Sequence, residues 1–398
     1  MKRNKVISII LVFILIFAGV NIKDAYGQEI NDNVVYLVGS MEKDQIFLES
    51  EDIEKSRPVA SMSKIMTYYI VKDSIKNGAY SLDTNVIIGE EVFPYTAPGN
   101  SRMDLVVGES ISVEDLLSGL MVVSGNDAAV ALAINDSGTE EAFVEKMNQK
   151  AKDLGLENTY FVNSHGLERE DGSSNSMSAH DLYKLAVNVC KDYPEVLEYS
   201  KIDVLVQDDR NFVGQATSVE FQQIAGYQGL KTGYTDAAGR CFTGVFDLSK
   251  YDSSKDFSIV TVVMNCDSGE ERFQSTKELV NFTNNNFNRK EILSTNEYID
   301  IINDNSMIED EIKIYPAEDL SLILREGDSP KLELEYDLPN GSLVKGEDYG
   351  DVIVSLNGET IGVVDLTVNK DFEKANILSR IGILFSNLFS YMFLMLFG

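Results

Sequence analysis

Residues 58–64 read Pro-Val-Ala-Ser-Met-Ser-Lys, which places Ser61 three positions before Lys64. Residues three apart lie on the same face of a helix. Pro58 stands just ahead, where proline often precedes a helix, and the largely apolar residues 65–71 continue the segment. The stretch therefore predicts a helix that begins near Ser61 and brings its hydroxyl group beside the Lys64 amine.

Two interpretations of this pair are open. A serine hydroxyl becomes a nucleophile when a base takes its proton, and a lysine can be that base only if burial or a neighbouring cation lowers its pKa. The other interpretation is an ordinary helix start with an exposed lysine, because a short motif of this kind recurs by chance. Motifs elsewhere in the chain have to decide between them.

Two such motifs follow. Ser124-Gly125-Asn126 comes after the apolar run 116–123, and Lys231-Thr232-Gly233 leads into a β-like stretch. The order Ser-x-x-Lys, Ser-x-Asn, Lys-Thr-Gly is the signature of penicillin-binding proteins and serine β-lactamases, which this chain therefore resembles.

The residue types suit acyl transfer. Ser61 would attack a carbonyl group, Lys64 would accept its proton, and Ser124 would relay a proton toward the leaving nitrogen. No metal or organic cofactor is required for this chemistry.

The other motif residues would bind the substrate. Asn126 can hold the substrate amide, and Thr232 offers a hydroxyl group to a carboxylate. Lys231 adds a positive charge that helps to keep the catalytic lysine neutral and attracts an anionic substrate end. Gly233 lets the backbone approach the substrate closely.

The surroundings of the motifs narrow the resemblance. The matching stretches are residues 58–64, 101–103, 108–109, 113–121, 124–129, 163–167 and 229–235. Together they resemble the low-molecular-weight penicillin-binding proteins that are D-alanyl-D-alanine carboxypeptidases. The resemblance runs from about Val34 into the C-terminal tail and is strongest from Pro58 to Arg240.

This resemblance implies a fold and a reaction. The fold would be α+β, with an antiparallel sheet flanked by helices, as in the penicillin-binding and β-lactamase fold. The enzyme would remove the terminal D-alanine from peptidoglycan stem peptides through a serine acyl-enzyme, and penicillin would acylate the same serine. Its role would lie in cell wall biogenesis.

The resemblance also implies two further site residues. The backbone N–H groups of Ser61 and Tyr234 would form the oxyanion hole, and Arg272 would help to hold the terminal carboxylate of the substrate, which suits the two-pronged arginine side chain. The alternative for Arg272 is a surface residue paired with its neighbouring glutamates. Residues 199–222 depart from the family pattern, so the resemblance does not predict the structure of the cleft rim.

Two rival functions remain. The commonest serine β-lactamases add a Glu-x-x-Leu-Asn segment between the second and third motifs, and no such segment lies between Asn126 and Lys231. The second rival is a catalytically inert penicillin-binding scaffold attached to the wall. The intact motif residues argue against it.

The chain divides into four predicted parts. Residues 1–27 read as a secretory signal peptide, with Lys2, Arg3 and Lys5 before an apolar run that is shorter than the ~20 residues of a membrane span. The catalytic domain would occupy residues 28–285. Residues 286–370 alternate short apolar runs with turns, which predicts a small β-sandwich domain.

The last part, residues 371–398, would anchor the protein to the membrane. Polar side chains of residues 377–397 fall on about half of a helix circumference, which predicts an in-plane amphipathic helix with Lys370, Lys374 and Arg380 near lipid headgroups. A true span is the alternative, because the run is long enough to cross a bilayer. We therefore expect an exported protein at the outer face of the cytoplasmic membrane.

Composition excludes one class of partner. The net charge of −30 argues against nucleic acid, which needs a basic surface. Cys190, Cys241 and Cys266 show no zinc spacing and are predicted to be buried thiols, with a Cys241–Cys266 disulfide as the alternative. His165 and His180 are predicted to be structural, because a serine–lysine site needs no histidine base.

Overall fold

The computed structural model describes residues 6–8, 30–42 and 45–375. The chain divides into two compact units. The first spans Asn21–Asn285, and the second combines Met1–Val20 with Asn286–Gly398. Each unit has a hydrophobic core of its own.

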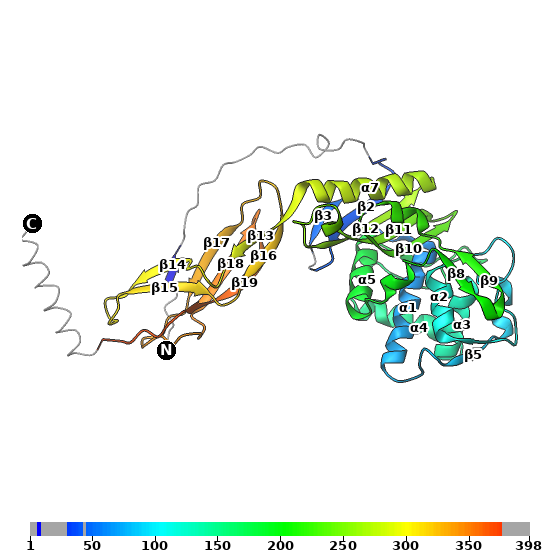
Figure 1. Ribbon diagram of the computed structural model, residues 1–398, viewed down its shortest axis with the longest axis horizontal. Helices are drawn as coiled ribbons and strands as arrows, with labels where there is room; N and C mark the ends of the chain where they lie inside the picture. Colours follow the sequence, from blue (N-terminus) through cyan, green and yellow to red (C-terminus); the bar gives the residue numbers. More distant parts are fainter. Residues whose placement is uncertain (1–5, 9–29, 43–44, 376–398) are drawn as a thin grey trace, which may run out of the picture. The chain divides into compact units, whose positions relative to one another are not determined.

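A five-stranded sheet forms the centre of the first unit (Figure 1). Its strand order is β10-β11-β12-β2-β3, and every neighbouring pair is antiparallel. The strands are β2 (Val35–Ser40), β3 (Ile46–Glu49), β10 (Tyr227–Thr235), β11 (Gly239–Asp247) and β12 (Ser258–Cys266). The short β-like runs 34–39 and 45–48 predict a hairpin, and the β-rich stretches 239–248 and 257–264 predict two buried antiparallel strands; both predictions are confirmed. In the described part of the chain, β10 is an edge strand with a strand neighbour on one side only.

Helices cover both faces of this sheet. Helix α7 (Gly269–Asn286) lies on one face, and α5 (Ala179–Asp192) lies on the other with the remaining helices beyond it (Figure 1). The sequence after Arg272 predicts a helix over residues 275–281, whereas α7 begins six residues earlier, at Gly269. The Ser268 hydroxyl accepts the N–H of Glu271 at 3.0 Å and so caps the helix start. Arg272 therefore lies inside α7 rather than ahead of it.

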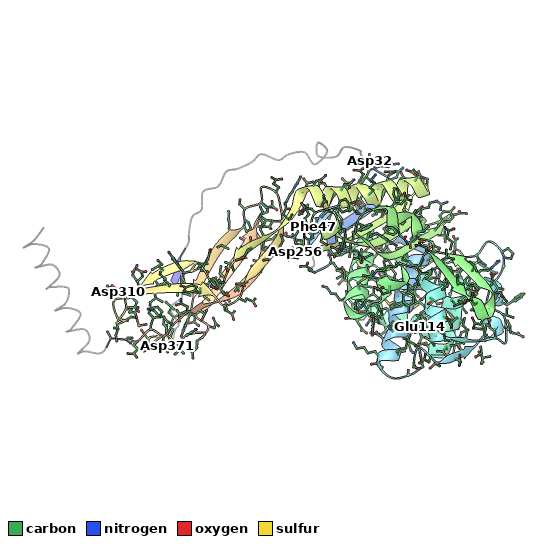
Figure 2. All side chains as sticks on the ribbon, in the orientation of Figure 1. Asp32, Phe47, Glu114, Asp256, Asp310 and Asp371 are labelled. Carbon is green, nitrogen blue, oxygen red and sulfur yellow. The ribbon has the colours of Figure 1, made fainter. Side chains whose placement is uncertain are left out.

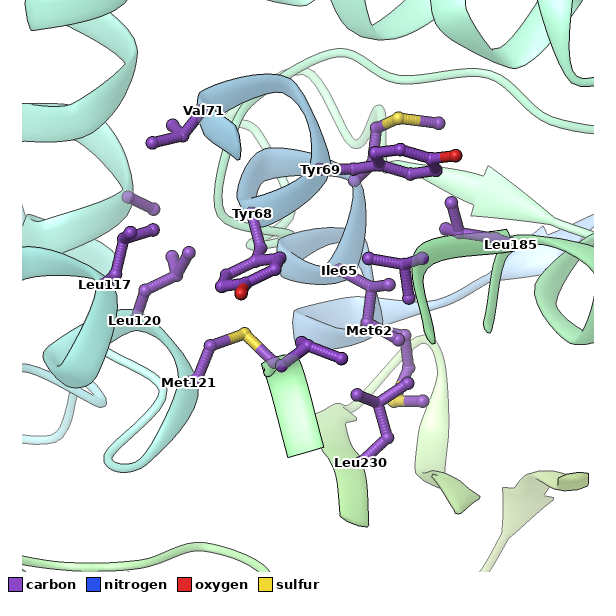
Figure 3. Close-up of a cluster of buried hydrophobic side chains, with 14 of the residues drawn as sticks. Met62, Ile65, Tyr68, Tyr69, Val71, Leu117, Leu120, Met121, Leu185 and Leu230 are labelled. Atoms are coloured by element: carbon purple, nitrogen blue, oxygen red, sulfur yellow. The ribbon is translucent and has the colours of Figure 1, made fainter. Parts of the chain in front are cut away.

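Helix α1 (Lys64–Lys76) runs through the middle of the helical layer, and every residue from Lys64 to Lys72 is buried. A helix that is apolar on all sides is expected in such a position. Tyr68 packs toward Leu120 of the neighbouring helix, with Leu185 on the other side of α1 (Figure 3). The turn before α1 is the 3-10 helix η2 (Ala60–Ser63), so the predicted helical start at Ser61 is confirmed in a tighter form.

The four-residue spacing of Phe143, Met147 and Ala151 predicts a helix over residues 140–154. In α4 (Glu140–Asp153), the predicted core positions Phe143, Met147 and Ala151 are all buried. The remaining elements of this unit are α2 (Val113–Met121), α3 (Asn126–Ser137), α6 (Val196–Tyr199), η3 (Glu90–Tyr95), η4 (Asp208–Arg210), η5 (Val219–Gln223), η6 (Leu248–Lys250), β4 (Arg57–Pro58), β5 (Asn85–Ile87), β6 (Ser110–Ser112), β7 (Ser176–Met177), β8 (Val204–Gln207) and β9 (Phe212–Gln215).

The second unit is all-β in its described part, as predicted. One sheet has the order β1-β17-β18-β19-β15-β14, and β13 pairs with β16 in a second sheet. Side chains of both sheets contribute to one core. The strands are β1 (Val6–Ser8), β13 (Phe287–Leu293), β14 (Asp300–Asn303), β15 (Glu311–Pro316), β16 (Leu320–Arg325), β17 (Lys331–Tyr336), β18 (Gly350–Leu356) and β19 (Glu359–Val368).

The β domain continues a few residues past β19. Phe372 exchanges two backbone hydrogen bonds with Leu343 and is buried, and the N–H of Ala375 donates to Ser306. The domain therefore extends at least to Ala375, beyond the predicted boundary at residue 370.

Two predictions concern segments outside the described residues. Apart from residues 6–8, the signal peptide lies outside them, and so does the anchoring helix beyond Ala375. Within the parts that the structure describes, no helix combines the length and the apolar composition needed to cross a membrane.

The structure also shows where the acidic side chains and the three cysteines lie. Acidic side chains such as Glu114 in the first unit and Asp310 in the second are exposed, in keeping with the net charge of −30 (Figure 2). Cys190, Cys241 and Cys266 are free and buried.

Candidate active site

The Ser61–Lys64 pair meets at the start of α1. The Lys64 Nζ lies 2.9 Å from the Ser61 Oγ. It also lies 2.7 Å from the Asn126 Oδ1 and 2.7 Å from the backbone oxygen of His165. The Lys64 side chain is completely buried, so these three oxygens are its immediate polar surroundings.

Burial decides the charge of this amine. It lowers the pKa of Lys64 far below its usual value, the Lys231 cation lowers it further, and only Asp127 acts in the opposite direction. A neutral amine has two N–H bonds and one lone pair. It can donate to Asn126 and His165 while its lone pair accepts the Ser61 hydroxyl proton. The arrangement is that of a general base aimed at a nucleophile.

The helical runs 113–120 and 127–135 predict that Ser124 lies in a connection between two helices, and it does lie between α2 and α3. It is 3% exposed, and its hydroxyl group has no hydrogen-bond partner in the described part of the chain. Its backbone is left-handed, with a φ of 61°, and so is that of Ala60, with a φ of 48°. Such conformations are uncommon for residues other than glycine and cluster at functional sites.

Asp127 holds this connection in place. Its buried carboxylate accepts the N–H groups of Met103 and Leu105 at 3.1 Å and that of Ala128 at 2.9 Å. The N–H of Asn126 donates to the Ser101 oxygen at 2.8 Å. The loop from residue 101 to residue 105 is thereby attached to the start of α3, which positions the Asn126 side chain.

The Lys-Thr-Gly motif lies on the edge strand β10. Lys231 is 1% exposed, and its Nζ donates to the Thr232 backbone oxygen at 3.1 Å. Burial, and then the Arg272 cation, lower the pKa of Lys231 to about 7. The Thr232 hydroxyl donates to the Thr217 hydroxyl at 2.9 Å.

Two glycines let neighbouring backbone reach the Ser61 turn. A Cβ on Gly233 would lie 3.0 Å from the Val59 oxygen and 3.2 Å from the Ser61 nitrogen. A Cβ on Gly166, whose φ is +95°, would lie 2.0 Å from the Ala60 oxygen. Strand β10 and the turn of residues 163–167 therefore both pack closely against the backbone of the Ser61 turn, although they come from different parts of the chain.

Tyr234 follows directly in β10, so its N–H lies one residue from the Gly233 contact with the Ser61 turn. Its side chain is 50% exposed. The hydroxyl group donates to Asp236 at 2.7 Å, and the Arg240 guanidinium lies 4.4 Å from the ring centre.

His165 contributes its backbone rather than its ring to the site. Its oxygen accepts from Lys64, while its Nδ1 accepts the N–H of Leu167 at 3.1 Å. Burial lowers the pKa of His165 to about 3, with smaller contributions from Lys64 and Arg169, so the ring is neutral at working pH. His180 lies elsewhere, against Glu54. Both histidines have the structural surroundings expected of them.

Arg272 is buried, at 7% exposure. Its Nη1 donates to the Cys241 oxygen at 3.3 Å, and its Nη2 pairs with Glu220. This partner comes from η5 and not from the neighbouring glutamates of α7, so the expected alternative of a surface arginine does not describe it.

The sequence matches known family models along most of its length. A family model described as D-alanyl-D-alanine carboxypeptidase matches residues 34–268, and a model of the penicillin-binding protein 5 C-terminal domain matches residues 287–374. The chain belongs to the D-alanyl-D-alanine carboxypeptidase family. Relatives in this family include D-alanyl-D-alanine carboxypeptidase DacA of Haemophilus influenzae, 30% identical over 332 residues that cover 81% of each chain. DacF of Bacillus subtilis is 28% identical over 335 residues, which cover 80% of this chain and 81% of the relative.

Solved structures of penicillin-binding proteins have the same fold. Penicillin-binding protein 5 from Haemophilus influenzae matches with a TM-score of 0.68 and 26% identity, over 85% of this chain and 97% of that one. Penicillin-binding protein D2 from Listeria monocytogenes in its ampicillin-bound form matches with a TM-score of 0.54 and 29% identity, over 62% of this chain and 95% of that one. The predicted family and fold class are confirmed.

Sequence reasoning missed four groups around this carboxypeptidase site. Asp127 lies inside a stretch that was noted, where a buried carboxylate beside Asn126 could have been suspected. Thr217 and Glu220 lie in the stretch that departs from the family pattern and carry no motif. The oxygen of His165 could not be singled out, because any residue type has a backbone carbonyl.

Proposed function

We propose that this chain is a serine-type D-Ala-D-Ala carboxypeptidase that removes the terminal D-alanine from peptidoglycan stem peptides. The observation that carries the proposal is the buried Lys64 amine, which lies within hydrogen-bond reach of the Ser61 hydroxyl and is neutralised by its surroundings. A carboxylate-ended peptide is the substrate that Lys231 and Thr232 favour.

The reaction has two halves. The Ser61 Oγ bonds to the scissile carbonyl carbon as its proton passes to Lys64. The C–N bond then breaks, Ser124 relays the proton to the leaving amine, and D-alanine departs. In the second half, water attacks the acyl ester, gives a proton back through Lys64 to Ser61, and frees the shortened peptide.

Binding groups surround these atoms. Asn126 holds the substrate amide, and the N–H groups of Ser61 and Tyr234 stabilise the oxyanion. The close approach of Gly233 to the Ser61 nitrogen supports this pairing. Lys231 and Thr232 receive the terminal carboxylate, and Arg272 adds positive charge at the same end. No step requires a metal or an organic cofactor.

β-Lactams would act as covalent inhibitors at Ser61, as the ampicillin-bound relative suggests by analogy. From the sequence we further propose export to the cell-wall side of the cytoplasmic membrane, with the residues after Ala375 on the membrane surface. The four-part division of the chain is part of the same proposal, with the β domain extended to Ala375.

The test is an assay of D-alanine release from a synthetic Lys-D-Ala-D-Ala peptide beside an assay of penicillin hydrolysis. A carboxypeptidase releases D-alanine and hydrolyses penicillin slowly. Rapid penicillin hydrolysis without D-alanine release would identify a β-lactamase, and neither activity would identify an inert scaffold. Either of those results would overturn the proposal.

A further inference from the structure

Residues 217–220 contact both Thr232 and Arg272, the two side chains expected near the substrate carboxylate. Thr217 bonds the Thr232 hydroxyl, and three residues later Glu220 pairs with Arg272. The segment enters η5 and lies in the part of the sequence that departs from the family pattern.

The Glu220–Arg272 pair is asymmetric in its exposure. The side chain of Arg272 is 9% exposed, whereas that of Glu220 is 39% exposed. The guanidinium also lies 5.4 Å from the ring centre of Phe221 and donates to the Cys241 oxygen. A carboxylate that approaches from solvent would therefore meet the negative Glu220 before the arginine. Both terminal nitrogens of Arg272 are already engaged, Nη2 by Glu220 and Nη1 by the Cys241 oxygen, so a two-pronged contact with the substrate carboxylate would have to displace Glu220.

The surroundings of Lys231 show what the pair can do instead. The charged groups that act there are Lys64 on α1, Arg272 on α7 and, through its pairing with Arg272, Glu220 on η5. Asp127 acts on Lys64 and the thiol of Cys241 lies near Arg272, but neither neutralises the arginine. Among the residues that the structure describes, Glu220 is the one carboxylate that forms an ion pair with Arg272, so its charge offsets the cation that opposes protonation of Lys231.

We propose that Glu220 is a positioning residue for the carboxylate end of the cleft: it holds Arg272 away from the substrate and offsets its charge, so that Lys231 stays protonated and receives the carboxylate. This inference rests on the proposed function and assigns to Arg272 an electrostatic role in place of direct contact.

The experiment compares pH profiles of kcat/KM for a carboxylate-ended peptide. Replacement of Glu220 by glutamine (Glu220→Gln) unmasks Arg272, which lowers the pKa of Lys231 and moves the falling, alkaline limb to lower pH by roughly half a unit or more. Below that limb, kcat/KM should change less than about threefold. The matched control is Glu270→Gln, because Glu270 carries the same charge on α7 but bonds Gln274. The control should leave the limb in place.

The double variant Glu220→Gln/Arg272→Gln separates charge from contact. Because both members of the pair are then neutral, the limb should return toward that of the parent. If Arg272 contacts the carboxylate, KM rises tenfold or more at every pH for the free peptide and not for its amidated form. That result would overturn the proposal, as would a fall in KM without a limb shift in Glu220→Gln.

A readout without turnover keeps the two proposals distinguishable. The pKa of Lys231 can be measured directly by an NMR titration of labelled lysine ε-carbons, in which the Lys231 signal is assigned by its absence in Lys231→Met. In Glu220→Gln this pKa should be displaced downward by the same amount as the alkaline limb. Thermal melts establish that each variant is folded. Displacement without D-alanine release would uphold this inference and reject the carboxypeptidase proposal. D-alanine release without displacement would do the opposite.

Discussion

At the scale of single residues, Lys64 carries the most information. Three oxygens lie within 2.9 Å of its Nζ, yet a neutral amine can donate to only two of them. The third contact must then run in reverse, from the Ser61 hydroxyl to the lone pair. The proposed role of Lys64 as proton acceptor thus follows from its burial and from the number of its partners.

The substitution Lys64→Arg tests this base. A guanidinium stays protonated at all working pH values and has no lone pair to offer, so acylation of Ser61 should stop, with a loss of at least about 100-fold in rate. Mass spectrometry after brief penicillin exposure, followed by peptide mapping, measures it. Full acylation of the variant, or an adduct on a residue other than Ser61 in the parent, would contradict the assignment.

A second residue-scale prediction concerns pH. The positive charge of Lys231 lowers the pKa of Lys64, so Lys231→Met removes that effect and raises the pKa of Lys64. Because Lys64 acts as a base only after losing its proton, the rising limb of the acylation profile should move to higher pH. Penicillin is a suitable probe, and the pseudo-first-order acylation rate is the measurement. A limb that stays in place or moves to lower pH would show that Lys231 does not act on Lys64.

Sequence alone predicted the residues that carry motifs but not those that act through space. Ser61, Lys64, Ser124 and Asn126 share spacing rules that a single chain displays. Glu220 and Arg272 are about fifty residues apart in the chain, and they pair only because the fold brings η5 and α7 together. No local pattern encodes such a contact.

At the scale of elements, the 163–167 turn depends on one glycine. Gly166→Ala places a Cβ about 2.0 Å from the Ala60 oxygen, at a φ of +95° that alanine disfavours. Gly172→Ala is the matched control, since its φ is +80° but its nearest neighbour is the tip of Glu168 at 3.9 Å. Both variants lose about 1 kcal/mol from backbone strain. Only Gly166→Ala should also displace the Ser61 turn, with at least about a tenfold slower acylation.

Thermal melts and acylation rates of the two variants measure these effects side by side. Equal acylation rates would mean that the 163–167 turn does not fix the nucleophile turn. The comparison uses one type of substitution throughout, so backbone strain cancels from the difference.

Element boundaries were harder to predict than elements. The four-residue spacing of Phe143, Met147 and Ala151 predicted α4 correctly, because a helix buries one stripe. The start of α7 was missed because it depends on a cap. Ser268, with Glu271 three residues on, has the spacing of a capping box, and this signal lies in a polar stretch with no apolar period.

At the scale of the whole molecule, the place where the β domain ends can be tested by truncation. Without its signal peptide, a chain that ends at Ala375 should be soluble, folded and active. A chain that ends at Asp371 loses the buried Phe372 ring and its bonds to Leu343, which should cost the β domain roughly 1.5–3 kcal/mol. Because the catalytic unit has its own core, its D-alanine release should be equal in both chains.

Denaturant unfolding measures the first difference, and a membrane sedimentation assay tests whether the residues after Ala375 are the anchor. A truncated chain that remains in the membrane pellet would show that the anchor lies elsewhere. Equal stability of the two truncated chains would show that Phe372 does not support the β domain.

The edge position of β10 has one further consequence. An extended peptide laid along an edge strand advances by about 3.3 Å per residue, and a slip of one residue turns every side chain to the other face. Thr232, the residue proposed to receive the carboxylate, and Gly233, which approaches the Ser61 backbone, are neighbours in β10. The strand would therefore set the distance between the bound carboxylate and the peptide bond that Ser61 attacks. If Thr232 holds the terminal carboxylate as proposed, we expect the last peptide bond of the substrate to lie over Ser61, so that the enzyme would cut at the end of a peptide rather than in its middle.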